Sequence, residues 1–109
     1  MMNETPAVGR SILSLADFSS LEGRKFNLRL GPSTLGEAEL VSATKPPADF
    51  AARPIGIREP FSLIFCLPVK SPLPQGIYAL EHPALGWLEI FLVPVALDAR
   101  GLSLQAVFN

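Results

Sequence analysis

Proline and glycine divide this chain into segments that are too short for most helices. The 109 residues include eleven prolines and eight glycines. The stretches between them are mostly shorter than the roughly 11–12 residues of an average helix, whereas strands of about five or six residues fit. Proline also lacks the N–H that a sheet or helix interior needs, so it marks the ends of elements. The spacing of these two residue types therefore predicts a mostly β protein.

One short helix is expected near the N-terminus. Ser14 is a suitable N-cap, and Leu15, Phe18 and Leu21 recur at the spacing of a helical stripe. Gly23 follows as a residue that commonly ends helices. We expect about two turns of helix here, with the apolar stripe packed against the remainder of the fold.

Beyond this helix the apolar residues alternate with polar ones. Phe26, Leu28 and Leu30 alternate with Asn27 and Arg29, which is the period of a strand with one buried face. Short turns between such runs favour antiparallel pairing of strands that are consecutive in the chain. We expect strands over residues 26–30, 37–43, 61–67, 77–82, 87–95 and 102–108.

These elements predict a mostly β fold, either a small antiparallel sandwich or a partly open barrel of about six strands. The short N-terminal helix would close one open end. Hydrophobic residues make up 49% of the chain, which is ample for a core. We expect residues 13–109 to form this single β domain and residues 1–12 to be a flexible N-terminal arm. Residues 45–59 contain three prolines and a glycine and are expected to form a long surface loop.

The charge balance argues against two classes of partner. Nine basic and ten acidic residues leave a formal net charge of −1. Nucleic-acid binding needs a basic stripe that displaces counterions from phosphates, and binding to an anionic membrane surface needs a polybasic segment. The basic residues are instead scattered singly, apart from the pair Arg24 and Lys25. We therefore expect neither a nucleic acid nor a membrane as partner.

Two further features favour a cytoplasmic location. The longest apolar stretch, residues 85–97, is interrupted by Glu89 and Pro94 and is shorter than the roughly 20 residues that span a bilayer. Cys66 is the only cysteine, which excludes an intrachain disulfide and suits a reducing compartment.

The acid–base candidates do not form a catalytic set. Glu81 and His82 are adjacent in a predicted strand, so their side chains point to opposite faces. Glu89 lies diagonally across a predicted hairpin from His82, which puts a His–Glu pair within reach, but no third group is present to orient it. We expect His82 to be a structural residue that forms a hydrogen bond in the turn of residues 83–86.

Nucleophile, metal and phosphate motifs are also missing. Cys66 lies among Ile64, Phe65 and Leu67, which indicates a buried, unreactive thiol. No serine, Ser71 included, sits in a G-x-S-x-G elbow. One histidine and one cysteine cannot supply the three or four ligands of a zinc site, and isolated glycines do not make a phosphate loop. We expect no catalytic residues, no cofactor and no metal.

Two predicted strands, 61–67 and 87–95, are apolar on both faces, whereas antiparallel strands of a monomer usually keep one polar face. The long loop, the helix or another subunit would have to cover the second face. We expect a second subunit, giving a homodimer. Tyr78 and Trp87 flank the 83–86 turn, either as an exposed binding platform or as a cross-strand pair. The candidate interaction surface comprises Tyr78, His82, Trp87, Leu88, Ile90 and Leu92.

The C-terminal half also carries a recurring set of strand and turn motifs. They read F-S-L-x-F from Phe61, L-x-Q-G-x-Y-x-L-x-H from Leu73, I-F-L-V-P-V from Ile90 and a terminal A-V-F-N. In these motifs the chain resembles, over roughly residues 15–109, a bacterial family of small uncharacterised proteins catalogued as a domain of unknown function. The resemblance implies a shared fold, a loose association with phage-tail-like loci, and no assigned catalytic residue.

Three functional interpretations follow. The favoured one is a non-enzymatic structural or protein-interaction module, with phage-tail-like or appendage assembly as a candidate process. The alternative is a β-barrel protein that binds a small apolar ligand. An enzyme centred on His82 ranks last.

Overall fold

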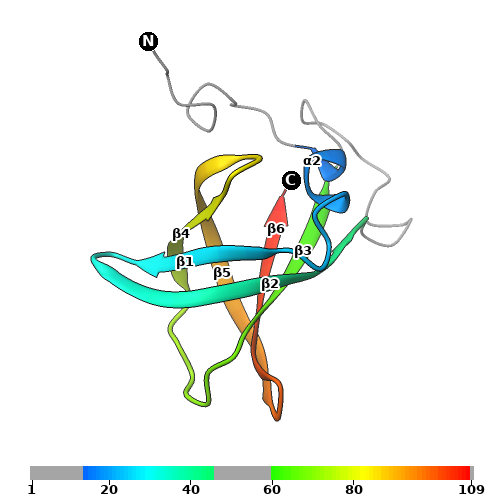
Figure 1. The fold of residues 1–109 in the computed structure, drawn as a ribbon. Helices are drawn as coiled ribbons and strands as arrows, with labels where there is room; N and C mark the ends of the chain where they lie inside the picture. Colours follow the sequence, from blue (N-terminus) through cyan, green and yellow to red (C-terminus); the bar gives the residue numbers. More distant parts are fainter. Residues whose placement is uncertain (1–13, 46–59, 109) are drawn as a thin grey trace.

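The computed structural model describes residues 14–45 and 60–108, and it shows six antiparallel strands closed into a barrel with one short helix at an end (Figure 1). The predicted N-terminal arm and nearly all of the predicted loop at residues 45–59 lie outside the described residues. The elements are α2 (Leu15–Ser19), β1 (Lys25–Leu30), β2 (Ser33–Thr44), β3 (Phe61–Leu67), β4 (Gly76–His82), β5 (Gly86–Asp98) and β6 (Gly101–Phe108).

The strands follow each other around the barrel in the order β1-β2-β3-β6-β5-β4. The first three strands follow one another as antiparallel neighbours, as do the last three, and the segment between β3 and β4 crosses from one group to the other. Because β4 returns beside β1, four of the strands lie in the order 4-1-2-3 of a Greek key. The expected pairing of all consecutive strands was therefore wrong at one point, since β3 pairs with β6 instead of β4.

The expectation of a mostly β fold with about six strands and one short N-terminal helix is confirmed, and the barrel is closed. The strands lie where the alternating runs predicted them. The second strand is longer than expected, since it begins at Ser33 directly after the Gly31 turn. Closure requires β1 to pair with β4 through the register Leu28 to Leu80.

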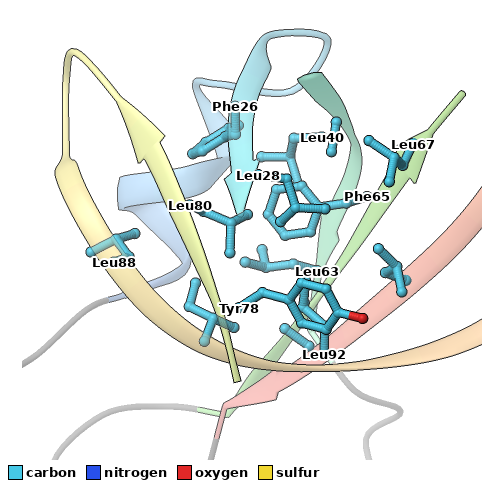
Figure 2. Packing of buried hydrophobic residues seen from close by; sticks show 14 of the residues in the cluster. Phe26, Leu28, Leu40, Leu63, Phe65, Leu67, Tyr78, Leu80, Leu88 and Leu92 are labelled. Carbon is cyan, nitrogen blue, oxygen red and sulfur yellow. The ribbon is translucent and has the colours of Figure 1, made fainter. Parts of the chain in front are cut away.

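Alternation also determines which side chains fill the barrel. Along β3 the residues Phe61, Leu63, Phe65 and Leu67 are buried, and the residues between them are half-buried. Eighteen buried apolar side chains, contributed by α2, all six strands and the β4–β5 turn, form one core in which Phe26 and Phe65 meet edge to face (Figure 2). A small barrel of this kind is filled by its own side chains.

The helix closes one end of the barrel, as expected. Ser14 N–H donates to the Asp17 carboxylate at 2.8 Å, which satisfies one of the free amides at the helix start. Phe18 is fully buried, and its ring lies 5.8 Å from that of Phe61 and 5.9 Å from that of Phe108. Across the described residues, no helix combines the length and the apolar character needed to cross a bilayer.

Candidate interaction surface

The outer face of β4 and β5 carries large apolar side chains in water. Ile77 on β4 pairs with Phe91 on β5, and these side chains are 56% and 49% exposed. Along β5, Val95 is also exposed and Val93 is half-buried. Trp87, four residues before Phe91 on the same face, is 41% exposed. We call Ile77, Trp87, Phe91, Val93 and Val95 the apolar strip.

Exposed apolar residues concentrate on this half of the barrel. In the described part of the chain seven large hydrophobic side chains are exposed, and only Val41 lies on the β1–β3 half. Scattered single residues of this kind are normal on a protein surface, whereas a row of them indicates a contact surface. The strip is therefore the strongest candidate for a functional surface among the described residues.

The predicted interaction face of β5 was wrong. Leu88, Ile90 and Leu92 are 6%, 5% and 0% exposed, and Figure 2 shows Leu88 and Leu92 directed into the barrel interior. These three residues belong to the core and are not available to a partner. The opposite side of the same strand, with Trp87 and Phe91, is the one that faces water.

Tyr78 is also a core residue. It pairs with Ile90, its ring is fully buried, and its hydroxyl donates a hydrogen bond to the carbonyl oxygen of Pro74 (Figure 2). Burial raises the pKa of the Tyr78 hydroxyl above its ordinary value, because the phenolate would lose its hydration. Tyr78 and Trp87 therefore form neither the expected platform nor the expected cross-strand pair, since they point to opposite sides of the barrel wall.

Trp87 has a different partner, which sequence reasoning missed. The Arg29 guanidinium of β1 lies 5.4 Å from the Trp87 ring centroid, although β4 runs between β1 and β5. Arg29 pairs with Ala79 on β4, and Ala79 pairs with Glu89 on β5. Because Ala79 is small, the Arg29 side chain can pass over it and cover the indole. A cation over an aromatic face is attracted to its π electrons.

Carboxylates surround this end of the strip. Glu81 pairs with Trp87 across the hairpin and accepts a hydrogen bond from Asn27 at 3.2 Å, and Glu89 is exposed on the same face. Two carboxylates thus stand beside the single Arg29 guanidinium. Among the residues that the structure describes, the Trp87 end of the strip is therefore acidic on balance.

The opposite end of β5 is basic on balance. Arg100 lies in the turn between β5 and β6, where its exposed guanidinium is 3.8 Å from the Asp98 carboxylate. The Lys70 ammonium donates to the Ala99 carbonyl of the same turn at 3.2 Å. Within the described part of the chain, two cations thus stand beside one carboxylate. The strip runs between two ends of opposite net charge.

His82 holds the turn after β4, as predicted. Its Nδ1 accepts a hydrogen bond from the Ala84 N–H at 3.0 Å, and its carbonyl accepts another from the Leu85 N–H at 2.9 Å. The imidazole is half-buried and lies 5.0 Å from the Phe26 ring. It belongs to the turn, and it does not extend the apolar strip.

Cys66 differs from its prediction. It occupies an outward position of β3, is only half-buried, and its thiol lies 3.8 Å from the Arg100 carbonyl oxygen. Its apolar neighbours Phe65 and Leu67 point inward, so they surround it in sequence but not in space. Within residues 14–45 and 60–108, no three His, Cys, Asp or Glu side chains gather in a way that would hold a metal ion.

The correct face of β5 had one signal in the sequence. Both sides of this strand are apolar, so periodicity alone cannot tell which side points inward. Glu89, however, shares its side with Trp87 and Phe91, and an unpaired carboxylate is seldom buried. This single residue indicated that Leu88, Ile90 and Leu92 face the core.

Comparison with known proteins gives a family but no activity. No curated protein and no solved structure matches the chain. A family model described as a domain of unknown function (DUF6916) matches residues 13–108, which is nearly the whole sequence. The chain therefore belongs to the DUF6916 family.

Proposed function

We propose that this protein is a non-enzymatic interaction module that self-associates as a homodimer through the apolar strip. The observation that carries the proposal is the exposed cross-strand pair of Ile77 and Phe91, extended along β5 by Trp87 and Val95. Burying such side chains against a partner contributes roughly 25 cal/mol for each Å² of apolar surface removed from water. Two-fold dimers are the commonest oligomers, and they need no second protein.

The alternative of a small apolar ligand inside the barrel has less support. The inward side chains of all six strands form one continuous cluster that includes Phe26, Phe65 and Tyr78. A ligand-holding barrel normally has eight or more strands, because a smaller one has an interior just wide enough for its side chains. An apolar ligand would have to displace several of these core residues.

The biological setting is a finer part of the same proposal. We propose a cytoplasmic bacterial protein that acts in the assembly of a phage-tail-like or other appendage structure. The support is the motif resemblance to proteins of such loci together with a single cysteine that suits a reducing compartment. A module that offers an apolar contact surface fits an assembly role.

Sedimentation equilibrium or light scattering of the purified full chain tests the proposal. We expect a concentration-dependent dimer, and we expect the double variant Ile77→Thr, Phe91→Thr to be a monomer with an unchanged circular dichroism spectrum. The matched control is Val41→Thr, which removes an exposed apolar side chain of β2 outside the strip. A wild-type mass of 11.7 kDa at every concentration would contradict self-association.

A further inference from the structure

We infer that the second copy packs on the apolar strip about a two-fold axis that crosses the strands near Val93, so that the two β5 strands face each other in opposite directions. This inference rests on the proposed self-association and specifies its geometry. It also assigns Glu89 and Arg100 as the residues that select this arrangement over the other.

Only two symmetric ways exist to lay one β5 face on another with the strands roughly aligned. If the two-fold axis runs along the strands, every residue of β5 faces the same residue of the second copy, so Glu89 meets Glu89. If the axis runs across the strands, the acidic end of one copy meets the basic end of the other. In both cases the sheets keep an angle of about 30° between strand directions.

Charge decides between these two arrangements. In the first one, Glu81 and Glu89 would face the same pair of carboxylates, and Arg100 would face Arg100. Like charges brought together in an interface are strongly unfavourable and suppress the wrong arrangement. In the second one, the carboxylates beside Trp87 meet Arg100 and Lys70 of the other copy. The ends of the strip therefore favour the antiparallel arrangement.

The spacing along β5 agrees with this axis. Trp87 lies six residues before Val93, or about 20 Å along the strand at ~3.3 Å for each residue. The β-bulge between Pro94 and Ala96 adds one residue on the other side, so the matching position is that of Arg100 in the β5–β6 turn, seven residues after Val93. The antiparallel arrangement thus places the turn that carries Arg100 over the Trp87 end of the other copy. It also places Phe91 against the β-bulge that carries Val95, so that exposed apolar side chains meet at the centre.

The closed barrel narrows the choice of partner further. Within residues 14–45 and 60–108, all six strands are paired on both sides, so this part of the chain offers no free edge to which a peptide strand could be added. What remains at the strip is a side-chain surface with an apolar centre and ends of opposite charge. A surface with this pattern is complementary to itself after a two-fold rotation, and a second copy is the partner it fits.

Charge reversal tests the arrangement. We expect Glu89→Lys alone and Arg100→Glu alone each to weaken the dimer roughly tenfold, because every altered contact occurs twice and each reversal replaces an exposed attraction by a repulsion. We expect the double variant, with both changes in one chain, to recover most of the wild-type affinity. The wild-type dimer should also weaken as salt screens the charged ends. Glu37→Lys on β2 is the matched control, since it reverses an exposed carboxylate away from the strip.

Cysteine crosslinking with a short bis-maleimide gives an independent readout in a Cys66→Ser background, since face-to-face sheets lie about 10 Å apart, farther than a disulfide reaches. Val93→Cys should crosslink to its own copy. Glu89→Cys should crosslink only when mixed with an Asp98→Cys chain, because the β-bulge between Pro94 and Ala96 puts Asp98 at the matching outward position. The thiols introduced at position 89 of the two copies would be about 26 Å apart at ~3.3 Å for each residue.

The failures of the two proposals are distinguishable. A wild-type monomer, or a dimer that is indifferent to Ile77→Thr, Phe91→Thr, overturns the proposed function and this inference with it. A dimer that depends on the strip but shows no rescue by the double charge reversal, or self-crosslinks at Glu89→Cys, overturns the antiparallel arrangement and leaves the proposed function intact.

Discussion

The guanidinium of Arg29 on β1 lies 5.4 Å from the ring centroid of Trp87 on β5, on the far side of the strand between them. This contact links strands that are far apart in sequence, and it reaches across β4, where Arg29 is paired with the small Ala79. The contact also positions the Trp87 side chain, which lies at the acidic end of the apolar strip.

The Arg29–Trp87 contact predicts a measurable coupling. In a double-mutant cycle of Arg29→Met and Trp87→Leu, we expect a coupling energy of about 0.5–1 kcal/mol, which is typical of an exposed cation–π pair. Chemical denaturation of the four proteins gives this value. Since Trp87 is the only tryptophan, Arg29→Met should also increase quenching of its fluorescence by acrylamide. Additive single effects and unchanged quenching would show that the contact contributes nothing.

His82 predicts a small, specific loss of stability. His82→Ala removes the acceptor of the Ala84 N–H and should lower the free energy of unfolding by about 1 kcal/mol. His82→Asn is the matched control, because an asparagine side chain can accept from the N–H two residues on. Urea unfolding should place His82→Asn between the wild type and His82→Ala. Equal losses in both variants would assign the effect to the Phe26 contact instead.

The burial of Tyr78 predicts that the protein loses stability at alkaline pH. Its pKa in the folded state is raised by burial, so folding is favoured by the protonated hydroxyl. The stabilisation is fully present below the unfolded-state pKa of about 10 and is lost as the pH rises through the higher folded-state pKa. Tyr78→Phe removes this dependence and also the hydrogen bond to Pro74, at a cost of about 1 kcal/mol near neutral pH. Thermal unfolding from about pH 7 to 11, a range that spans the ordinary tyrosine pKa, compares the two proteins. Parallel curves would refute the assignment.

We expect a substitution at Gly101 to destabilise the protein more than one at Gly31. Its φ is +135°, and a Cβ there would overlap the carbonyl oxygen of Leu67 and the Cα of Pro68. Gly101→Ala therefore combines backbone strain on the order of 1–3 kcal/mol with a clash against rigid main chain. The matched control is Gly31→Ala, where φ is +58° but the space is open. Denaturation midpoints should fall further for Gly101→Ala than for Gly31→Ala.

The helix and the strands could be predicted from the sequence, because residues close together in the chain determine them. The helix around Phe18 followed from its cap and stripe, and the alternation at Phe26 and Leu28 identified a strand with one buried face. The order of strands around the barrel did not follow. The sequence between Leu67 and Gly76 does not indicate whether β4 pairs with β3 or with β1. This pairing is determined by the closure of the whole barrel.

The candidate surface illustrates the same limit. Phe91 and Leu92 are equally apolar, so the apolar pattern of β5 led to the wrong side, with Leu88, Ile90 and Leu92, and only Glu89 marked the side that faces water. The Arg29–Trp87 contact could not be predicted either, because it requires the β1–β4 pairing that closes the barrel.

The β3–β4 connection divides the chain into two contiguous groups of three strands, and each group pairs with the other along both of its sides. The connection therefore acts as a tether that sets the effective concentration of one half at the other. If residues 68–75 were too short to span the end of the barrel, the same pairings would form between two chains, as a domain-swapped dimer with two complete barrels. The length of this one segment keeps the fold within a single molecule, independently of any contact made by the outer surface.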